Sequence, residues 1–319
     1  MDYRWLGQTG VRVSPLCMGV MTFGDAADEA ESERMFHRCL DVGINFFDCA
    51  NVYGAGESER VLGRLMAGKR DDLVITSKVG MGSGLNRRGG SRRHMMQEVE
   101  ASLRRLNTDR IDLYFLHHFD DNTPVEETLR AFDDLVRDGK IVYVGVSNWA
   151  AWQVARAQGI CALHGWAAIA CLQPMYSLVK RQAEVEILPM AQELGIGVIS
   201  YSPLGGGLLS GKYAAGPPPQ GRFLENEMYQ RRYGPEHYWE TARRFPEIAE
   251  ARGVHPATLA VAWAMGGPGI TAPIIGARNA TQLEASLAAL ELELSAEERE
   301  ELSALTPTPS PANDRLEEQ

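Results

Sequence analysis

Short apolar runs, many of them β-branched, alternate with longer amphipathic segments along most of the chain. Such runs, bounded by Gly or polar residues, predict buried strands. Eight of them lie at Leu16 to Met21, Ile44 to Phe47, Leu73 to Thr76, Ile111 to Leu116, Ile141 to Val146, Ala167 to Leu172, Gly197 to Tyr201 and Thr271 to Ile275. Most are followed by a polar side chain, so each predicted strand has a defined end.

The segments between these runs have helical spacing. In one of them Met35, Phe36, Cys39 and Leu40 fall on a single helical face. Ser58, Ser91 and Asn279 are candidate N-caps, and Asn279 with Gln282 has capping-box spacing. We expect helices at Ala30 to Asp41, Ser58 to Met66, Ser91 to Leu106, Pro124 to Asp138, Glu184 to Glu193 and Pro256 to Ala264, and one that starts at Asn279.

Strict alternation of strands and helices predicts a parallel sheet, either closed or open. A count of eight strands favours closure. An open dinucleotide-binding sheet would place G-x-G-x-x-G after its first strand, where this chain has Thr22-Phe23-Gly24-Asp25. The predicted fold class is therefore α/β, a (β/α)8 TIM barrel, with residues 1–319 as one domain.

Three segments do not fit the repeating unit. Residues 1–13, with Gly7 and Gly10, suggest a short N-terminal hairpin. Residues 205–253, after the seventh strand, are too long for an ordinary connection and predict a lid insertion. Residues 306–319, rich in Pro and acids, read as a tail.

Composition and charge narrow the range of partners. A hydrophobic fraction of 45% and a charged fraction of 23% are ordinary for a globular domain. A net charge of -10 disfavours nucleic acid and anionic membrane surfaces, so we expect a small-molecule partner. The start of the chain has no apolar signal region, and residues 257–277, although uncharged, are interrupted by Gly266 to Gly269. Five scattered cysteines without a C-x-x-C pair predict free thiols and a cytoplasmic location.

Polar side chains end six of the predicted strands. In a closed barrel these ends meet at one mouth, which gathers Asp48, Lys78, His117, Ser147, Gln173 and Tyr201. Tyr53, in the loop after Asp48, could lie beside that acid, and a cation near its phenol would make it a usable proton donor. Taken singly, Asp48 and Lys78 could be a buried ion pair, His117 a core histidine and Tyr53 a loop aromatic. Six polar ends at one mouth favour a functional site.

A metal site is the first rival interpretation of this mouth. His117, His118 and Asp120 lie close together in the sequence. Neighbouring residues at a strand end tend to point in opposite directions, so the two histidines should not share one ion. We expect no metal.

Five separated segments, in the same order along the chain, resemble the signatures of the aldo-keto reductase superfamily. They are Gly43 to Gly54, Thr76 to Lys78, Asp112 to His117, Gly145 to Asn148 and Ile274 to Arg278, and the similarity extends over roughly Tyr3 to Leu294. Tyr201 to Gly205 and Ser210 to Tyr213 are most similar to the bacterial sugar-reductase-like branch and the potassium-channel β subunits. The resemblance implies a (β/α)8 barrel that binds NADPH in extended form and reduces aldehydes or ketones.

The resemblance also implies a catalytic tetrad of Asp48, Tyr53, Lys78 and His117. Tyr53 would donate a proton to the carbonyl oxygen, and Lys78 would lower the pKa of that phenol. Asp48 would hold Lys78 charged and in place, and His117 would orient or polarise the carbonyl.

The cofactor contacts expected here follow from the same resemblance. Ser147, Asn148 and Gln173 would bind the carboxamide, Tyr201 would stack on the nicotinamide, Ser202, Leu204 and Gly206 would line the pyrophosphate with Lys212 and Arg222, Arg278 would bind the adenosine 2′-phosphate, and Gln282 would lie near the adenine. Thr22 and Gly276 belong to the same set. Ser286 stands where the family usually has Asn, which could weaken an adenine contact.

Residues 206–213 nearly match the P-loop pattern G-x-x-x-x-G-K-[ST], which makes an ATPase or kinase a second rival. The last position is Tyr213, whose hydroxyl lies too far from the backbone to ligate Mg²⁺ as Ser or Thr does. The motif also follows the seventh strand rather than the first. We interpret it as a glycine-lined cradle for the cofactor's pyrophosphate.

The walls of the substrate site must come from loops. The candidates are Phe23, His118, Phe119 and Trp149, with Met81 and the lid aromatics Phe223, Tyr229, Tyr233, Tyr238 and Trp239 as weaker ones. The leading prediction is an NADPH-dependent carbonyl reductase acting on a small-molecule carbonyl compound. The alternative is a cofactor-sensing subunit like the channel β proteins, which carry Asn at the position of His117. A histidine there favours catalysis.

Overall fold

Eight parallel strands close into a barrel, in the order β10-β3-β4-β5-β6-β7-β8-β9. The structure, a computed structural model, describes residues 1–213, 226–313 and 315. The barrel strands are β3 (Cys17–Gly19), β4 (Phe46–Asp48), β5 (Val74–Val79), β6 (Ile111–Leu116), β7 (Ile141–Ser147), β8 (Ile169–Gln173), β9 (Gly197–Ser200) and β10 (Ala272–Ile275). The predicted fold class is confirmed.

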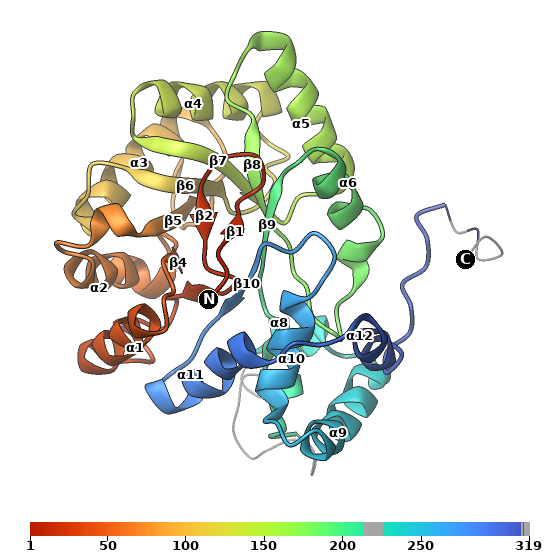
Figure 1. Cartoon of the computed structure of the whole chain (residues 1–319). Helices are drawn as coiled ribbons and strands as arrows, with labels where there is room; N and C mark the ends of the chain where they lie inside the picture. Colours follow the sequence, from red (N-terminus) through yellow and green to blue (C-terminus); the bar gives the residue numbers. More distant parts are fainter. Residues whose placement is uncertain (214–225, 314, 316–319) are drawn as a thin grey trace.

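Helices surround this barrel (Figure 1). They are α1 (Glu29–Asp41), α2 (Glu57–Leu65), α3 (Arg92–Leu106), α4 (Val125–Arg137), α5 (Ala151–His164), α6 (Ile187–Glu193), α8 (Glu227–Arg232), α9 (Glu236–Ala251), α10 (Pro256–Met265), α11 (Ala280–Leu287) and α12 (Ala296–Ser303). Short 3-10 helices lie at η1 (Tyr53–Gly56), η2 (Arg70–Asp72), η3 (Gln182–Glu184), η4 (Gly205–Ser210) and η5 (Ala288–Glu291). None of the described helices is long and apolar enough to cross a membrane.

Alternation along each strand divides the core in two. Every second side chain on β6, such as Leu113 and Phe115, belongs to a small cluster inside the barrel. Their neighbours Tyr114 and Leu116 join the larger cluster between the strands and the helices. The same period of two sends the last inward position of each strand to one end of the barrel, where it can serve a site.

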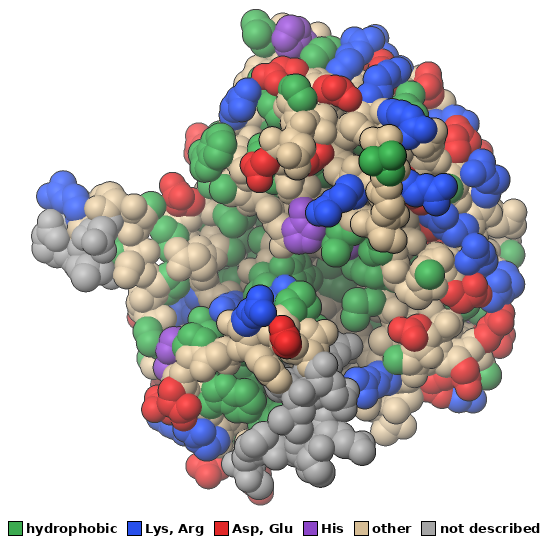
Figure 2. Space-filling view, turned by 180° about the vertical axis from the view of Figure 1, so that it is seen from behind, with side chains coloured by type: hydrophobic (Ala, Val, Ile, Leu, Met, Phe, Trp, Pro, Cys, Tyr) green, Lys and Arg blue, Asp and Glu red, His purple; other side chains and the backbone are tan. Residues whose placement is uncertain are grey.

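As predicted, residues 1–13 contain a hairpin, formed by β1 (Arg4–Trp5) and β2 (Arg12–Val13), and it closes the other end of the barrel. Leu6 and Val13 are fully buried in the inner cluster. A Cβ on Gly7 would lie 2.5 Å from the backbone nitrogen of Gly197, at the start of β9. Figure 1 shows the hairpin in front of the strands, and Figure 2, from the opposite side, shows a hollow with hydrophobic side chains around it.

The insertion after β9 contains η4, α8 and α9 and continues into α10. Residues 214–225 fall outside the described part of the chain, and with them the predicted contacts of Arg222 and Phe223. After the insertion, Trp263 of α10 is fully buried and stacks on Tyr176, with ring centroids 5.1 Å apart. This aromatic pair packs the helix that follows the insertion against the segment after β8.

Several sequence predictions about the helices need correction. Helix α5 was not placed, and the helix expected from Glu184 begins at Ile187, after a separate 3-10 turn. Ser58 does not cap α2, because Gly56 with φ 91° occupies that position. Ser58 lies in the first turn instead, where its buried hydroxyl donates to the carbonyl of Val20 over 2.6 Å. Gly is favoured at a helix cap with positive φ. The Ser58 hydroxyl is therefore not used as a cap and contributes to tertiary packing instead.

The start of α11 and the start of the expected C-terminal tail also differ from expectation. Asn279 caps α11 by accepting from the N–H of Gln282 over 2.9 Å, but the Gln282 side chain accepts from Arg278 rather than completing a capping box. Thr306 is not part of a free tail, because its buried hydroxyl donates to the carbonyl of Leu178 over 3.0 Å.

Candidate active site

The carboxyl ends of β4 and β5 bring an acid and an amine together. On β4, Phe46 points into the barrel, Phe47 outward and Asp48 inward again. On β5, the outward residues Ile75 and Val79 leave Lys78 on the inner face. Because β4 and β5 are neighbours in the barrel, the two side chains meet at its mouth.

Lys78 is completely buried and makes three polar contacts. Its ammonium donates to Asp48 Oδ2 over 2.7 Å, to the carbonyl of Cys49 over 2.7 Å and to the phenol oxygen of Tyr53 over 3.3 Å. Burial lowers the pKa of Lys78, but the charges of Asp48 and Tyr53 outweigh it, so the net pKa lies above its ordinary value. Lys78 therefore stays charged at neutral pH.

Asp48 is held from three sides. In addition to Lys78, the Thr76 hydroxyl donates to its Oδ1 over 2.6 Å and the Gln173 amide donates to the same atom over 2.9 Å. The sequence analysis missed Thr76 as a partner of Asp48. The available signal was its position two residues before Lys78, on the same face of β5.

Tyr53 begins η1, directly after the loop that follows β4. Its ring lies 4.9 Å from the ammonium of Lys78. Burial raises the pKa of Tyr53 to about 12, Lys78 lowers it and Asp48 raises it. The expected lowering by Lys78 is present but smaller than the cost of burying a phenolate, so the phenol keeps its proton at neutral pH.

His117 follows β6 at the same mouth, with its ring centroid 6.1 Å from that of Tyr53 in an edge-on arrangement. Burial, Lys78 and His118 lower the pKa of His117 to about 2. Its Nδ1 is buried and has no hydrogen-bond partner among the described residues. The imidazole is therefore neutral near pH 7.

The rings of His117 and His118 lie nearly parallel, with centroids 5.5 Å apart and an interplanar angle of 8°. The expectation that they point in opposite directions is wrong, because His117 and His118 follow the end of β6 and no longer have strand geometry. Within the described ranges, no group of three or more His, Cys, Asp or Glu side chains could hold a metal ion.

A second hydrogen-bonded group lies beside the tetrad, at the ends of β7 and β8. The Ser147 hydroxyl donates to the carbonyl of Gln173 over 2.8 Å, and the Asn148 amide donates to the carbonyl of His117 over 2.9 Å. The Tyr201 hydroxyl donates to Asn148 Oδ1 over 2.7 Å. These four predicted cofactor residues are thus brought together, although the Gln173 amide is directed to Asp48.

The segment after β9 turns sharply. Ser202, Gly205, Gly206 and Gly207 have positive φ values of 61°, 57°, 67° and 104°. The turn leads into the 3-10 helix η4 rather than into an α-helix that begins at the glycines, as a P-loop requires. Leu204 is half-buried in it, and the exposed Lys212 lies with its ammonium near Gly207 and 4.9 Å above the ring of Tyr213.

The third group lies where the first and last strands of the barrel end. The Thr22 hydroxyl donates to the carbonyl of Ala277 over 2.7 Å and joins the loops after β3 and β10. Gly276 and Arg278 are exposed there, next to the N-terminus of α11. The Arg278 guanidinium has no hydrogen bond or ion pair with any described residue. An unpaired cation beside a helix N-terminus suits a phosphate.

Ser286 is only 2% exposed. The position where the family usually has Asn therefore lies inside the helix packing.

Aromatic side chains lie on one side of the mouth. Phe119 contacts Trp149 edge-on at 4.8 Å and Trp152 at 6.5 Å between ring centroids. Trp152, which the sequence analysis did not select, is 62% exposed, whereas the predicted substrate contact Phe23 is fully buried. The indole N–H of Trp149 is buried without a partner among the described residues.

The lid helix α8 reaches this region. Burial and the charge of Arg232 lower the pKa of His118, and Arg232 lies 5.6 Å above the ring of Tyr229. A Cβ on Gly206 would lie 2.9 Å from the Tyr229 ring. The lid therefore contributes a cation near His118, which no local sequence signal indicated.

The fold and this arrangement correspond to a family of barrel oxidoreductases. A sequence model of the aldo/keto reductase family matches residues 15–306. The chain belongs to the aldo/keto reductase family.

Relatives of known name agree with this assignment. The chain is 38% identical over 327 aligned positions, 97% of each chain, to the uncharacterized oxidoreductase YrpG of Bacillus subtilis (strain 168). It is 35% identical to a probable voltage-gated potassium channel subunit beta of Oryza sativa subsp. japonica, over 92% of each chain. It is 33% identical to L-glyceraldehyde 3-phosphate reductase of Escherichia coli O157:H7, over 91% of this chain and 88% of that protein. The family membership supports an oxidoreductase that reduces carbonyl groups.

Proposed function

We propose that this protein reduces an aldehyde or ketone to an alcohol with NADPH, using Tyr53 as the proton donor. The observation that carries the proposal is the buried Lys78 ammonium, 2.7 Å from Asp48 and 3.3 Å from the phenol oxygen of Tyr53 at the mouth of the barrel. Members of the aldo/keto reductase family generally use nicotinamide cofactors. The site residues fit such a group.

The choice of NADPH over NADH rests on Arg278. Its exposed guanidinium has no partner in the described chain and lies beside the N-terminus of α11, where an additional phosphate would be bound. Ser147, Asn148, Gln173 and Tyr201 would hold the nicotinamide end. When bound, NADPH would supply the hydride that the carbonyl carbon receives.

The side chains of the tetrad would handle the charge and the proton. As the carbonyl bond is reduced, negative charge develops on its oxygen, and the phenol of Tyr53 donates a hydrogen bond and then the proton to it. The ammonium of Lys78 stabilises the phenolate that is left, and Asp48 keeps this ammonium in place. His117, neutral because its pKa is about 2, orients the carbonyl oxygen by hydrogen bonding.

An assay of purified protein tests the proposal. Loss of NADPH absorbance should be measured with a panel of aldehydes, ketones and quinones that includes glyceraldehyde 3-phosphate, the compound in the name of one relative. Tyr53→Phe should abolish turnover while NADPH still binds. Tyr143→Phe is the matched control, because that hydroxyl donates to Thr9 of the N-terminal hairpin, at the other end of the barrel.

A cofactor-sensing subunit is the second candidate, and the likeness to proteins named potassium channel subunit beta supports it. His117 in contact range of Tyr53 favours turnover instead. Tight NADPH binding with no turnover on any member of the panel would establish the sensing function and refute the reductase.

A further inference from the structure

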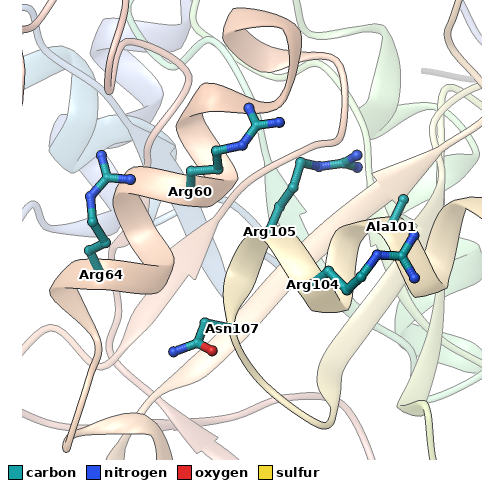
Figure 3. A pocket seen from close by; sticks show the side chains of 6 residues that line it. All are labelled: Arg60, Arg64, Ala101, Arg104, Arg105 and Asn107. Atoms are coloured by element: carbon teal, nitrogen blue, oxygen red, sulfur yellow. The ribbon is translucent and has the colours of Figure 1, made fainter.

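An arginine-lined cavity lies between α2 and α3, on the outside of the barrel. Its volume is about 490 Å³, and its lining residues are Arg60, Arg64, Ala101, Arg104, Arg105 and Asn107. Figure 3 shows Arg60 and Arg64 on α2 and Arg104 and Arg105 on α3. Among the described residues no acidic side chain lines the cavity, although glutamates outside the lining pair with Arg60, Arg64 and Arg105.

This cavity is separate from the candidate active site. Asn107 caps the end of α3, shortly before β6 begins at Ile111. The cavity therefore lies toward the amino ends of the strands, whereas the tetrad lies at their carboxyl ends. A ligand there would not compete directly with a carbonyl substrate.

Two glycines and an ion pair between the partly buried Arg105 and the buried Glu59 fix the walls. A Cβ on Gly63 would lie 2.7 Å from the backbone of Leu106, so α2 and α3 approach closely at this point. A Cβ on Gly56 would lie 2.8 Å from Cδ of Arg105, so glycine makes room for the arginine stem. Arg105 Nε then donates over 2.5 Å to Glu59, which is completely buried and also accepts from Ser77 of β5.

Donors in the cavity are available to a ligand. Arg104 has no side-chain partner among the described residues, and neither has Nη1 of Arg105. Arg60 and Arg64 pair with glutamates, but both arginine side chains are 48% exposed. Exposed ion pairs contribute little to stability, so phosphate oxygens can replace the glutamates. The helix dipole favours arginine in the last turn of a helix. This preference alone does not explain why four arginines line one cavity.

We propose that this cavity binds a small polyphosphate anion. The planar fork of each guanidinium matches two phosphate oxygens. Four arginines in this volume exceed what one phosphate group requires. Of the described residues that line the cavity, only Ala101 is apolar, and none is aromatic and able to stack on a nucleobase. The ligand class is therefore a compound with two or more phosphates and no aromatic ring.

Titration calorimetry at low ionic strength tests this with the full chain and inorganic phosphate, pyrophosphate and tripolyphosphate as probes. An Arg278→Ala background removes the proposed cofactor phosphate contact, so the result does not depend on the proposed function. One saturable site is expected, with affinity that rises from phosphate to tripolyphosphate. Arg60→Gln with Arg104→Gln should weaken tripolyphosphate binding about tenfold or more, because charged hydrogen bonds are lost.

The matched control is Arg93→Gln with Arg156→Gln. It removes the same amount of positive charge. Arg93, like Arg104, has no side-chain partner among the described residues. The exposed Arg156 pairs with Glu126, as Arg60 pairs with a glutamate. Its affinity should stay within about twofold of the background, since screening limits distant charges. Arg104→Gln alone, which breaks no hydrogen bond or ion pair with a described residue, should still weaken binding severalfold. Absence of saturable binding, equal weakening by both double variants, or phosphate binding as tightly as tripolyphosphate would each overturn the proposal.

Discussion

The buried pair of Lys78 and Asp48 predicts a large energetic coupling between the two positions. The Lys78 side chain is 0% exposed and that of Asp48 is 4% exposed, with 2.7 Å between the charged atoms. We expect each of Lys78→Met and Asp48→Asn to lower the free energy of unfolding strongly. We expect the double variant to lose much less than the sum of the two.

The magnitude follows from what each change leaves behind. Without Lys78, the Asp48 carboxylate keeps the donors Thr76 and Gln173 but no cation. Without the carboxylate, the ammonium keeps the carbonyl of Cys49 but no anion. Breaking a buried pair in this way costs about 3–5 kcal/mol, whereas removing both charges leaves none unpaired. A coupling energy of about 2 kcal/mol or more is therefore expected.

Urea unfolding at neutral pH, followed by circular dichroism, measures the four free energies of this cycle. A parallel cycle on Arg156 and Glu126 is the control, because those side chains are 52% and 46% exposed at a similar distance of 2.9 Å. Exposed pairs contribute about 0.2–1 kcal/mol. A coupling at Lys78 and Asp48 no larger than that of the control would refute the argument that burial gives the pair its strength.

Three further predictions concern the site. Tyr53→Phe should lower kcat about 10²- to 10⁴-fold, as loss of a general acid does, with the Kd of NADPH unchanged by fluorescence titration; retention of most of kcat would remove Tyr53 from its role. Arg278→Ala should weaken NADPH binding roughly 10- to 150-fold, equivalent to about 1.5–3 kcal/mol, while NADH binding stays the same; equal affinities for both cofactors in the unmutated protein would contradict the assignment. His117 has a pKa of about 2 in the folded chain and an ordinary pKa near 6.5 when the chain is unfolded. Between these pH values the unfolded state binds more protons than the folded state. The free energy of unfolding should therefore fall as the pH drops below about 6.5. Urea midpoints at several pH values should show this slope and a smaller slope in His117→Gln; identical slopes would exclude His117 as its source.

The barrel could be predicted because its signal repeats. Each βα unit gives a short apolar run and an amphipathic segment, so errors at single elements, such as the missing α5, leave the count of eight strands intact. Helix starts were less predictable. Ser58 has the residue type of an N-cap, but Gly56 takes that role because the chain needs a positive φ there.

The types of side chain at the mouth of the barrel could be predicted from the sequence. The burial and the charges around each of them could not. Asp48, Tyr53 and Lys78 follow from strand ends and the neighbouring loop, and the structure brings them within hydrogen-bonding distance. The lowering of the Tyr53 pKa by Lys78 was expected, but the larger raising by burial was not. That shift depends on how much of the phenol is buried by segments distant in sequence, and burial raises the pKa more than Lys78 lowers it.

Ser77, on the outward face of β5, indicates a buried contact that was not predicted from the sequence. Ser77 alternates with Lys78, so it must point away from the barrel interior into the packed layer of helices. A hydroxyl buried in that layer needs a partner, and Ser77 finds it in Glu59 of α2 over 2.5 Å. Glu59 in turn requires a cation, which Arg105 of α3 provides. Ser77, the residue beside Lys78, is thus connected through the buried Glu59 and the partly buried Arg105 to the wall of the arginine-lined cavity, and the strand period that positions Lys78 also accounts for that connection.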